Sequence, residues 1–176
     1  MLFRSEALAS YDRALGLGGE NADILNNRGM LLCELQAAIL ALESFTRAIA
    51  AAPTRSDGYA NRGGLLMQVG RVAEAASDYE QALARDPKSQ PALYGYGSAL
   101  IELNRHDEAI AALQRLTNLN PDYSYALGML VHARKTACNW RDSAPTNRSP
   151  PPAPSPSPAP ASPSSVANFP ARRPPG

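Results

Sequence analysis

A period of 34 positions constrains the fold of this chain more than any other feature of its sequence. Small residues recur at this interval, at Ala7, Ala41, Ala75 and Ala109. A larger residue follows each of them by four positions, as Tyr11, Phe45, Tyr79 and Leu113. Glycines and prolines keep the same register, at Gly29, Gly63 and Gly97 and at Pro53, Pro87 and Pro121. Several series in one register indicate a stacked repeat architecture.

Each unit of this period reads as two helices. In the unit over residues 56–89, the stretch from Gly58 to Val69 places apolar and small residues at helical spacing: Tyr59, Gly63, Leu66 and Met67. Gly70 predicts a left-handed turn, and Val72 to Arg85 predicts a second helix that ends before Pro87. We expect the small residues to bring the two helices close together. One such pair cannot cover its own apolar face, so neighbouring pairs must stack.

The repeating pattern resembles a known family, the tetratricopeptide repeat. Its residues in the first full unit are Leu25, Gly29, Leu32, Ala41, Phe45, Ala48 and Pro53. The departures are mild: Arg28 and Arg62 stand where the family often has leucine, and Gln36 replaces a glycine or asparagine of the turn. The resemblance implies an all-α solenoid of about eight antiparallel helices in a right-handed superhelix. The array would cover residues 1–141, with a half repeat at 5–19, full repeats at 22–55, 56–89 and 90–123, and a terminal helix at 124–138.

Proline separates this array from the end of the chain. Twelve of the 16 prolines lie beyond residue 143, in a segment that is otherwise mostly alanine and serine. Such a composition cannot bury enough apolar surface to offset the conformational entropy of the chain. We therefore predict a disordered tail over residues 142–176.

A second, narrower resemblance concerns the segment that follows the last repeat. Residues 120–127, His132-Ala133-Arg134 and Cys138-Asn139-Trp140 are similar to the segment that joins the repeats to the catalytic domain in bacterial members of the O-linked N-acetylglucosamine transferase (SPINDLY-like) family, although Asn139 replaces an aspartate. This similarity implies the substrate-recruiting fragment of a glycosyltransferase, truncated before its catalytic domain. The tail would then be sequence read out of frame. A short protein with a genuine proline-rich tail is the alternative.

Composition excludes several classes of function. The 17 basic and 16 acidic residues give a net charge of +1, without the basic excess typical of nucleic-acid binders. The longest apolar run, residues 37–42, is too short to span a bilayer, and the N-terminus lacks a signal-peptide core, so we expect a cytoplasmic protein without membrane contacts. Two widely separated cysteines and two histidines leave little for metal or acid–base chemistry, so we expect no metal or cofactor. No stretch after the repeats has the glycine-rich turn or the strand pattern of a nucleotide-sugar site, so we expect no enzymatic activity.

The resemblance to tetratricopeptide repeats implies that the first helix of each pair lines a concave groove. The candidate groove residues are Asp23, Asn26, Asn27, Met30, Asp57, Asn61, Met67, Tyr94 and Ser98. Asn27 and Asn61 lie one period apart, and an asparagine amide both donates and accepts hydrogen bonds, so the pair could hold the backbone of an extended peptide. In the transferase family an asparagine ladder holds substrate peptides in this way. The ladder is interrupted here at Gly95, and the alternative is that both asparagines are solvated surface residues.

These observations favour a non-enzymatic scaffold that binds a peptide or partner protein in its groove. The glycosyltransferase fragment is the second hypothesis. The third is a structural segment that associates with itself or with another chain through its exposed terminal helices.

Overall fold

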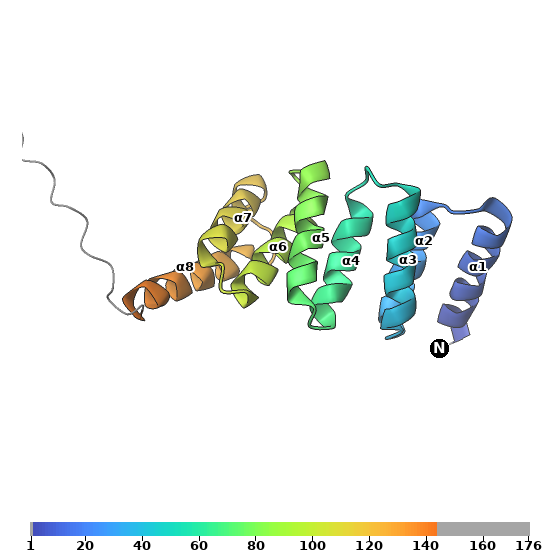
Figure 1. The fold of residues 1–176 in the computed structure, drawn as a ribbon, viewed down its shortest axis with the longest axis horizontal. Coiled ribbons are helices and arrows are strands. Elements are labelled where there is room, and N and C mark those ends of the chain that lie inside the picture. The colour runs from blue at the N-terminus through green and yellow to red at the C-terminus, as the bar shows by residue number, and fades with distance from the viewer. Residues whose placement is uncertain (1, 144–176) are drawn as a thin grey trace, which may run out of the picture. The chain divides into compact units, whose positions relative to one another are not determined.

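A computed structural model describes the backbone of residues 2–143 and the side chains of residues 4–138 (Figure 1). This part of the chain contains helices and no strand. The helices are α1 (Leu2–Gly18), α2 (Ala22–Glu34), α3 (Ala38–Ala51), α4 (Asp57–Gln68), α5 (Val72–Arg85), α6 (Gln90–Glu102), α7 (His106–Leu119) and α8 (Ala126–Ser143). The predicted all-α solenoid of about eight helices is confirmed.

The predicted helix boundaries are accurate inside the array and less so at its ends. Helix α5 has the predicted bounds, whereas α1 begins at Leu2 and α8 ends at Ser143 rather than at residue 138. Residues 124 and 125 form a turn ahead of α8, because Tyr125 has a φ of 65° that cannot continue a helix. The disordered tail predicted for 142–176 lies outside the described residues, apart from its first two positions, which belong to α8.

The turns inside the helix pairs repeat one local geometry. Gln36, Gly70 and Asn104 follow one another at the interval of the repeat and adopt φ values of 58°, 77° and 59°. The next amide in each turn donates to a carbonyl of the preceding helix, over 2.9 Å from Ala37 to Leu32 and over 2.8 Å from Arg71 to Leu66. This left-handed closure satisfies carbonyls that the helix end would leave without partners. Gln36 therefore forms the same turn as the glycine in the second unit.

Glycine sets the distance between the two helices of a pair. A Cβ atom added to Gly29 would lie 2.5 Å from Cε1 of Phe45, and one added to Gly63 would lie 3.1 Å from Cε1 of Tyr79. The Tyr79 ring also contacts Gly95 of the following unit. Phe45 and Tyr79 are both buried. The predicted role of the small residues is thus confirmed, and Tyr79 also joins two successive units.

The helices form an inner and an outer row. Each first helix approaches the next one, since α2 contacts α4, α4 contacts α6 and α6 contacts α8 with Cα atoms within 8 Å. The second helices α3, α5 and α7 make no such contacts with one another. Because α2, α4, α6 and α8 are more closely spaced, they lie on the inside of the curved array. We call their exposed surface the inner face.

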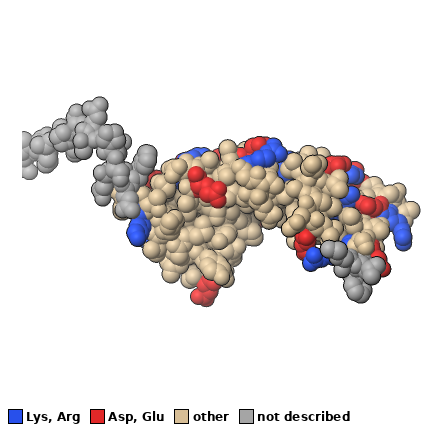
Figure 2. All heavy atoms as spheres, turned by 90° about the horizontal axis from the view of Figure 1, so that it is seen from below, with Lys and Arg blue, Asp and Glu red and all other residues tan. Residues whose placement is uncertain are grey.

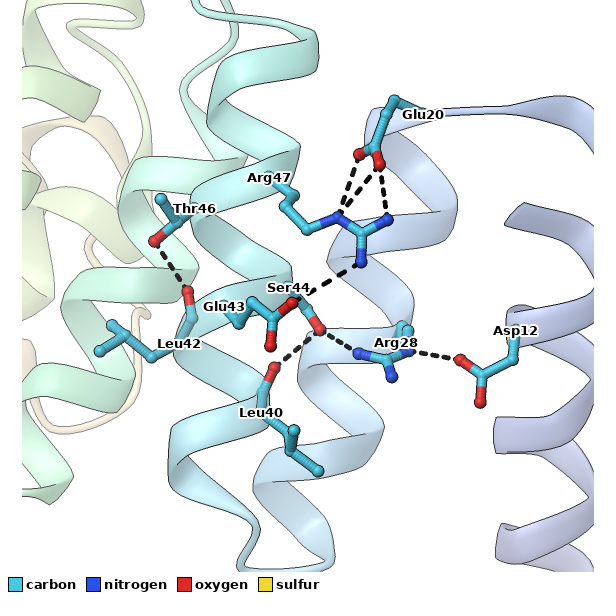
Figure 3. A network of polar contacts seen from close by, with 9 residues as sticks. All are labelled: Asp12, Glu20, Arg28, Leu40, Leu42, Glu43, Ser44, Thr46 and Arg47. Atoms are coloured by element: carbon cyan, nitrogen blue, oxygen red, sulfur yellow. Dashed lines mark hydrogen bonds and ion pairs between the residues drawn. The ribbon is translucent and has the colours of Figure 1, made fainter. Parts of the chain in front are cut away.

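Arginines at two leucine positions of the family pattern tie neighbouring units together. The guanidinium of Arg28 on α2 donates to Asp12 on α1 over 2.7 Å and to Ser44 on α3 over 2.6 Å (Figure 3). One unit later, Arg62 donates two hydrogen bonds of 2.7 Å to Asp78. It also reaches Thr46 of the preceding unit over 3.3 Å. Each arginine thereby bridges the second helices of two successive units.

Candidate functional site

The N-terminal half of the inner face carries the predicted asparagine pair. Asn27 on α2 is exposed, and Asn61 is partly exposed at the matching position of α4. Met30, one helical turn after Asn27, is also exposed. These three side chains are exposed or partly exposed, and their role in binding stays a prediction.

Two other predicted groove residues serve the core instead. Asn26 is only 7% exposed, and its Oδ1 atom is buried without a hydrogen-bond partner. It lies beside Gly58, where an added Cβ would be 3.8 Å from that oxygen. Met67 is half-buried and packs against the central hydrophobic core. Asn26 therefore contributes packing between α2 and α4, and its role in ligand binding stays a prediction.

An arginine binds the two aspartates that open the first helices. Arg55 donates to Asp23 over 2.6 Å and to Asp57 over 2.7 Å. These hydrogen bonds, the one to Asp57 first, raise the pKa of the Arg55 guanidinium. The three groups are exposed, so they contribute little to stability, but they reduce the net charge at this edge of the inner face.

The C-terminal half of the inner face contains two adjoining hollows, one between α6 and α8 and one between α6 and the segment that connects α7 to α8. The first has a volume of about 370 Å³ and is lined by Ser98, Ile101, Glu102, Tyr125, Gly128, Met129 and His132. The second has a volume of about 490 Å³ and is lined by Gln90, Tyr94, Asn120, Asp122, Tyr123, Ser124 and Tyr125. Tyr125 lines both hollows. We call this pair the tyrosine hollows; they include the predicted residues Tyr94 and Ser98.

Three tyrosines give the tyrosine hollows their character. The rings of Tyr94 and Tyr123 pack with centroids 5.6 Å apart at an interplanar angle of 41°. Tyr125 is 82% exposed and has a positive φ, which is uncommon and costly for a bulky side chain. Such strain often accompanies a functional surface. An exposed aromatic ring held in this way can stack on an apolar or planar group of a ligand.

Polar groups accompany the rings. The Ser98 hydroxyl donates to Sδ of Met129 over 3.7 Å, and the Asn120 amide donates to Gln90 over 3.0 Å. The carboxylates of Glu102 and Asp122 form no ion pair with any residue that the structure describes. The tyrosine hollows can therefore bury apolar groups of a ligand and also offer it hydrogen-bond acceptors.

Sequence reasoning named only Tyr94 and Ser98 among the residues that line the tyrosine hollows, and it missed the others, including Tyr123, Tyr125, Met129 and His132. The repeat register contained the signal, because Tyr125, Met129 and His132 follow Pro91, Gly95 and Ser98 by one full period. Extending the groove positions into the terminal helix would have placed all three on the inner face.

The described residues show neither a large patch of one charge in Figure 2 nor a metal site. On the face shown in Figure 2, many basic and acidic side chains lie next to one another, some acidic side chains stand apart, and uncharged atoms make up most of the area. Among the described residues, no group of three or more histidines, cysteines and acids is placed to hold a metal ion. None of the described helices is long and apolar enough to cross a membrane.

Comparisons with known proteins agree with this architecture. Two family models described as tetratricopeptide repeat match residues 3–56 and 66–131. No curated protein has a sequence that matches this chain. Among solved structures, a tetratricopeptide repeat protein from Parabacteroides merdae is 24% identical with a TM-score of 0.70, and the alignment covers 80% of this chain and 56% of that chain. For MamA the values are 20% identity, a TM-score of 0.70, and coverage of 79% and 75%.

A third similar structure is the second tetratricopeptide domain of human RPAP3, which was solved in complex with an HSP70 peptide. It is 25% identical with a TM-score of 0.59, and the alignment covers 62% of this chain and 92% of that domain. The regular repeat register, the stacked helix pairs and the two matching family models lead to one conclusion. Residues 3–56 and 66–131 of this chain are tetratricopeptide repeats.

Proposed function

We propose that this chain is a protein-interaction scaffold that binds a peptide segment of a partner protein on its inner face. The observation that carries this proposal is the pair of tyrosine hollows, which combine an exposed ring at Tyr125 with acceptors at Glu102 and Asp122 that form no ion pair within the described residues. Two domains of similar fold were solved with peptides from HSP90 and HSP70. Those titles support peptide binding as the mode and identify no ligand for this chain.

The geometry supports a division of the inner face into two parts. The tyrosine hollows would bury apolar side chains of the ligand, and burial of one such side chain contributes about 1.5–3 kcal/mol. Asn27 and Asn61 would donate to and accept from the ligand backbone further along the groove. A peptide in contact with both parts would span the units from α2 to α8.

Peptide selection tests this proposal without a known ligand. Random peptides displayed on phage are selected on the immobilised chain, and the binders are then measured by fluorescence anisotropy. Tyr125→Ala should weaken binding at least tenfold, because it removes the most exposed ring of the surface. Gly128→Leu should do the same by filling the first hollow, and an added Cβ at Gly128 meets no atom within 4 Å, so the fold should tolerate it.

The control variant is Leu17→Ala, which removes an equally exposed side chain from α1, outside the inner face. It should leave binding unchanged. If selection gives no binder, or if Tyr125→Ala and Gly128→Leu bind as well as the original chain, the proposed function is wrong. A double variant, Asn27→Ala with Asn61→Ala, tests the second part of the inner face. If it binds as well as the original chain while Tyr125→Ala and Gly128→Leu do not, the asparagines are solvated residues and the tyrosine hollows alone bind the peptide.

The similarity around residues 120–140 supports one narrower candidate, recruitment of substrates for a protein O-glycosyltransferase. The structure describes this segment as the turn before α8 and most of α8, and a family model described as tetratricopeptide repeat matches the segment up to residue 131. This candidate requires a nucleotide-sugar-binding domain encoded just downstream in another reading frame. Genomic DNA without such a coding sequence would exclude it.

A further inference from the structure

The tyrosine hollows contain acidic side chains whose charge no neighbouring cation balances. Glu102 lines the first hollow and Asp122 the second, and no lysine or arginine that the structure describes lines either one. Both carboxylates are exposed, and neither forms an ion pair with any of residues 4–138. His132 is the one lining side chain that can become positively charged. Where histidine is neutral, the lining of the tyrosine hollows is therefore negative.

The start of the array shows how this chain balances acids between inner helices. Between α2 and α4, Arg55 donates to Asp23 over 2.6 Å and to Asp57 over 2.7 Å. Two periods later, Tyr123 stands in the place of Arg55 and Tyr125 in the place of Asp57. An aromatic ring thus replaces the internal cation at the end of the array, and a ligand can supply the positive charge there.

Tyrosine rings are suitable partners for a cationic side chain. A guanidinium or ammonium group over the face of an aromatic ring is attracted by the quadrupole of the ring. The chain contains one such pair, because Cζ of Arg85 lies 4.0 Å from the centroid of the Tyr59 ring. The exposed ring of Tyr125 lines both hollows. The apolar stems of lysine and arginine can therefore lie against this ring while their charged ends reach the carboxylates.

We propose that the tyrosine hollows bind a peptide segment with two basic side chains, one paired with Glu102 and the other with Asp122. This inference rests on the proposed function and specifies its ligand. Helix α6 sets the spacing, because Gln90 lines the second hollow, Glu102 lines the first, and the two residues begin and end this helix. At 1.5 Å per residue they are about 18 Å apart, which an extended chain covers in about five residues.

Selection of random displayed peptides on the full chain tests the spacing first. The selected peptides should be enriched in pairs of arginine or lysine about five residues apart. One such peptide, labelled with fluorescein, is then measured by fluorescence anisotropy at about pH 8, where histidine is neutral. Citrulline in place of an arginine, or acetyl-lysine in place of a lysine, removes the charge and nearly keeps the shape. Each replacement should weaken binding by about fivefold or more.

Variants of the chain locate the two contacts. Asp122→Asn and Glu102→Gln should each weaken binding by about fivefold or more. Both should unfold at the same temperature as the original chain, because neither carboxylate has an ion pair to lose within residues 4–138. The control Glu80→Gln removes the same charge from an exposed residue of α5, outside the inner face, and should leave binding unchanged. Glu102→Arg should restore binding of a peptide in which one of the two basic residues is glutamate.

The outcomes separate this inference from the proposed function. Selected peptides that Tyr125→Ala weakens, but that lack the pair of basic residues or tolerate its neutral replacements, would overturn the inference and leave the proposed function in place. Binding that either Asp122→Asn or Glu102→Gln leaves unchanged would do the same. A selection that gives no binder would overturn both.

Discussion

Two alanine substitutions at helical glycines should change stability in opposite directions. Both Gly29 and Gly64 lie inside helices, where alanine is favoured over glycine by about 1 kcal/mol. At Gly64 the new Cβ would be 3.7 Å from Oη of Tyr79, which is an ordinary contact. At Gly29 it would lie 2.5, 2.7 and 2.8 Å from three atoms of the Phe45 ring. Carbon atoms normally approach to about 3.5–4.0 Å, so the ring must move by about 1 Å.

Phe45 has little room for that movement, because it is buried with Leu32 and Ala41 in the same cluster. Overpacking of this kind costs about 1–3 kcal/mol, or more. After subtraction of the gain in helix propensity of about 1 kcal/mol, Gly29→Ala should destabilise the fold by up to about 2 kcal/mol. Gly64→Ala should stabilise it by about 0.5–1 kcal/mol. Gly29→Ala should therefore be less stable than Gly64→Ala by about 0.5–3 kcal/mol.

Urea unfolding followed by circular dichroism at 222 nm measures this difference. Repeat arrays can lose cooperativity, so the slope of unfolding free energy against urea must be the same for both variants before the values are compared. Equal stability of Gly29→Ala and Gly64→Ala would refute the reasoning, because it would show that Phe45 does not pack against Gly29.

Three further predictions concern single side chains. Asp78→Ala should cost about 2–4 kcal/mol, because it leaves the half-buried Arg62 without its carboxylate, whereas Asp78→Ser, the residue of the preceding repeat, should cost less in the same urea assay. Burial raises the pKa of Tyr79 from 10.0 to about 12. As the pH rises, the phenol of Tyr79 ionises in the unfolded chain before it does so in the folded chain. Its contribution of about 2–3 kcal/mol to the free energy of unfolding is therefore complete below pH 10 and lost by about pH 12. In Tyr79→Phe the free energy of unfolding should change less with pH over this range. Burial also raises the pKa of the Cys33 thiol, so a thiol reagent at pH 8 should label the exposed Cys138 first, and mass spectrometry of early time points checks the order.

The repeat register predicted the fold because its signals are local. Gly70 lies one period after Gln36. Because the two residues share a position in the repeat, a turn could be predicted at Gln36, which a glutamine by itself does not indicate. The close approach of helices was predictable from Gly29 and Gly63 for the same reason. The ends of α1 and α8 were less predictable, because a terminal helix has no neighbouring unit that limits its length.

The candidate site was only partly predictable from the sequence. The inner position of Asn27 and Asn61 follows from the helical period, but the burial of Asn26 depends on how closely α4 approaches α2 beside Gly58. The tyrosine hollows depend on the missing side chain at Gly128 and on the turn at Tyr125. Both features belong to the end of the array, where the terminal helix departs from the pattern of the preceding units. Periodicity alone describes what the units share, and it cannot show such a difference.

The central claim is that successive helix pairs share one continuous core, and contacts of the Tyr79 ring test it most directly. The ring lies against Gly63 of its own unit and Gly95 of the next. We expect nuclear Overhauser effects from the ring protons of Tyr79 to the Hα protons of both glycines. Cross-peaks to Gly63 without any to Gly95 would show helix pairs that do not stack, and absence of both would contradict the helix pair itself.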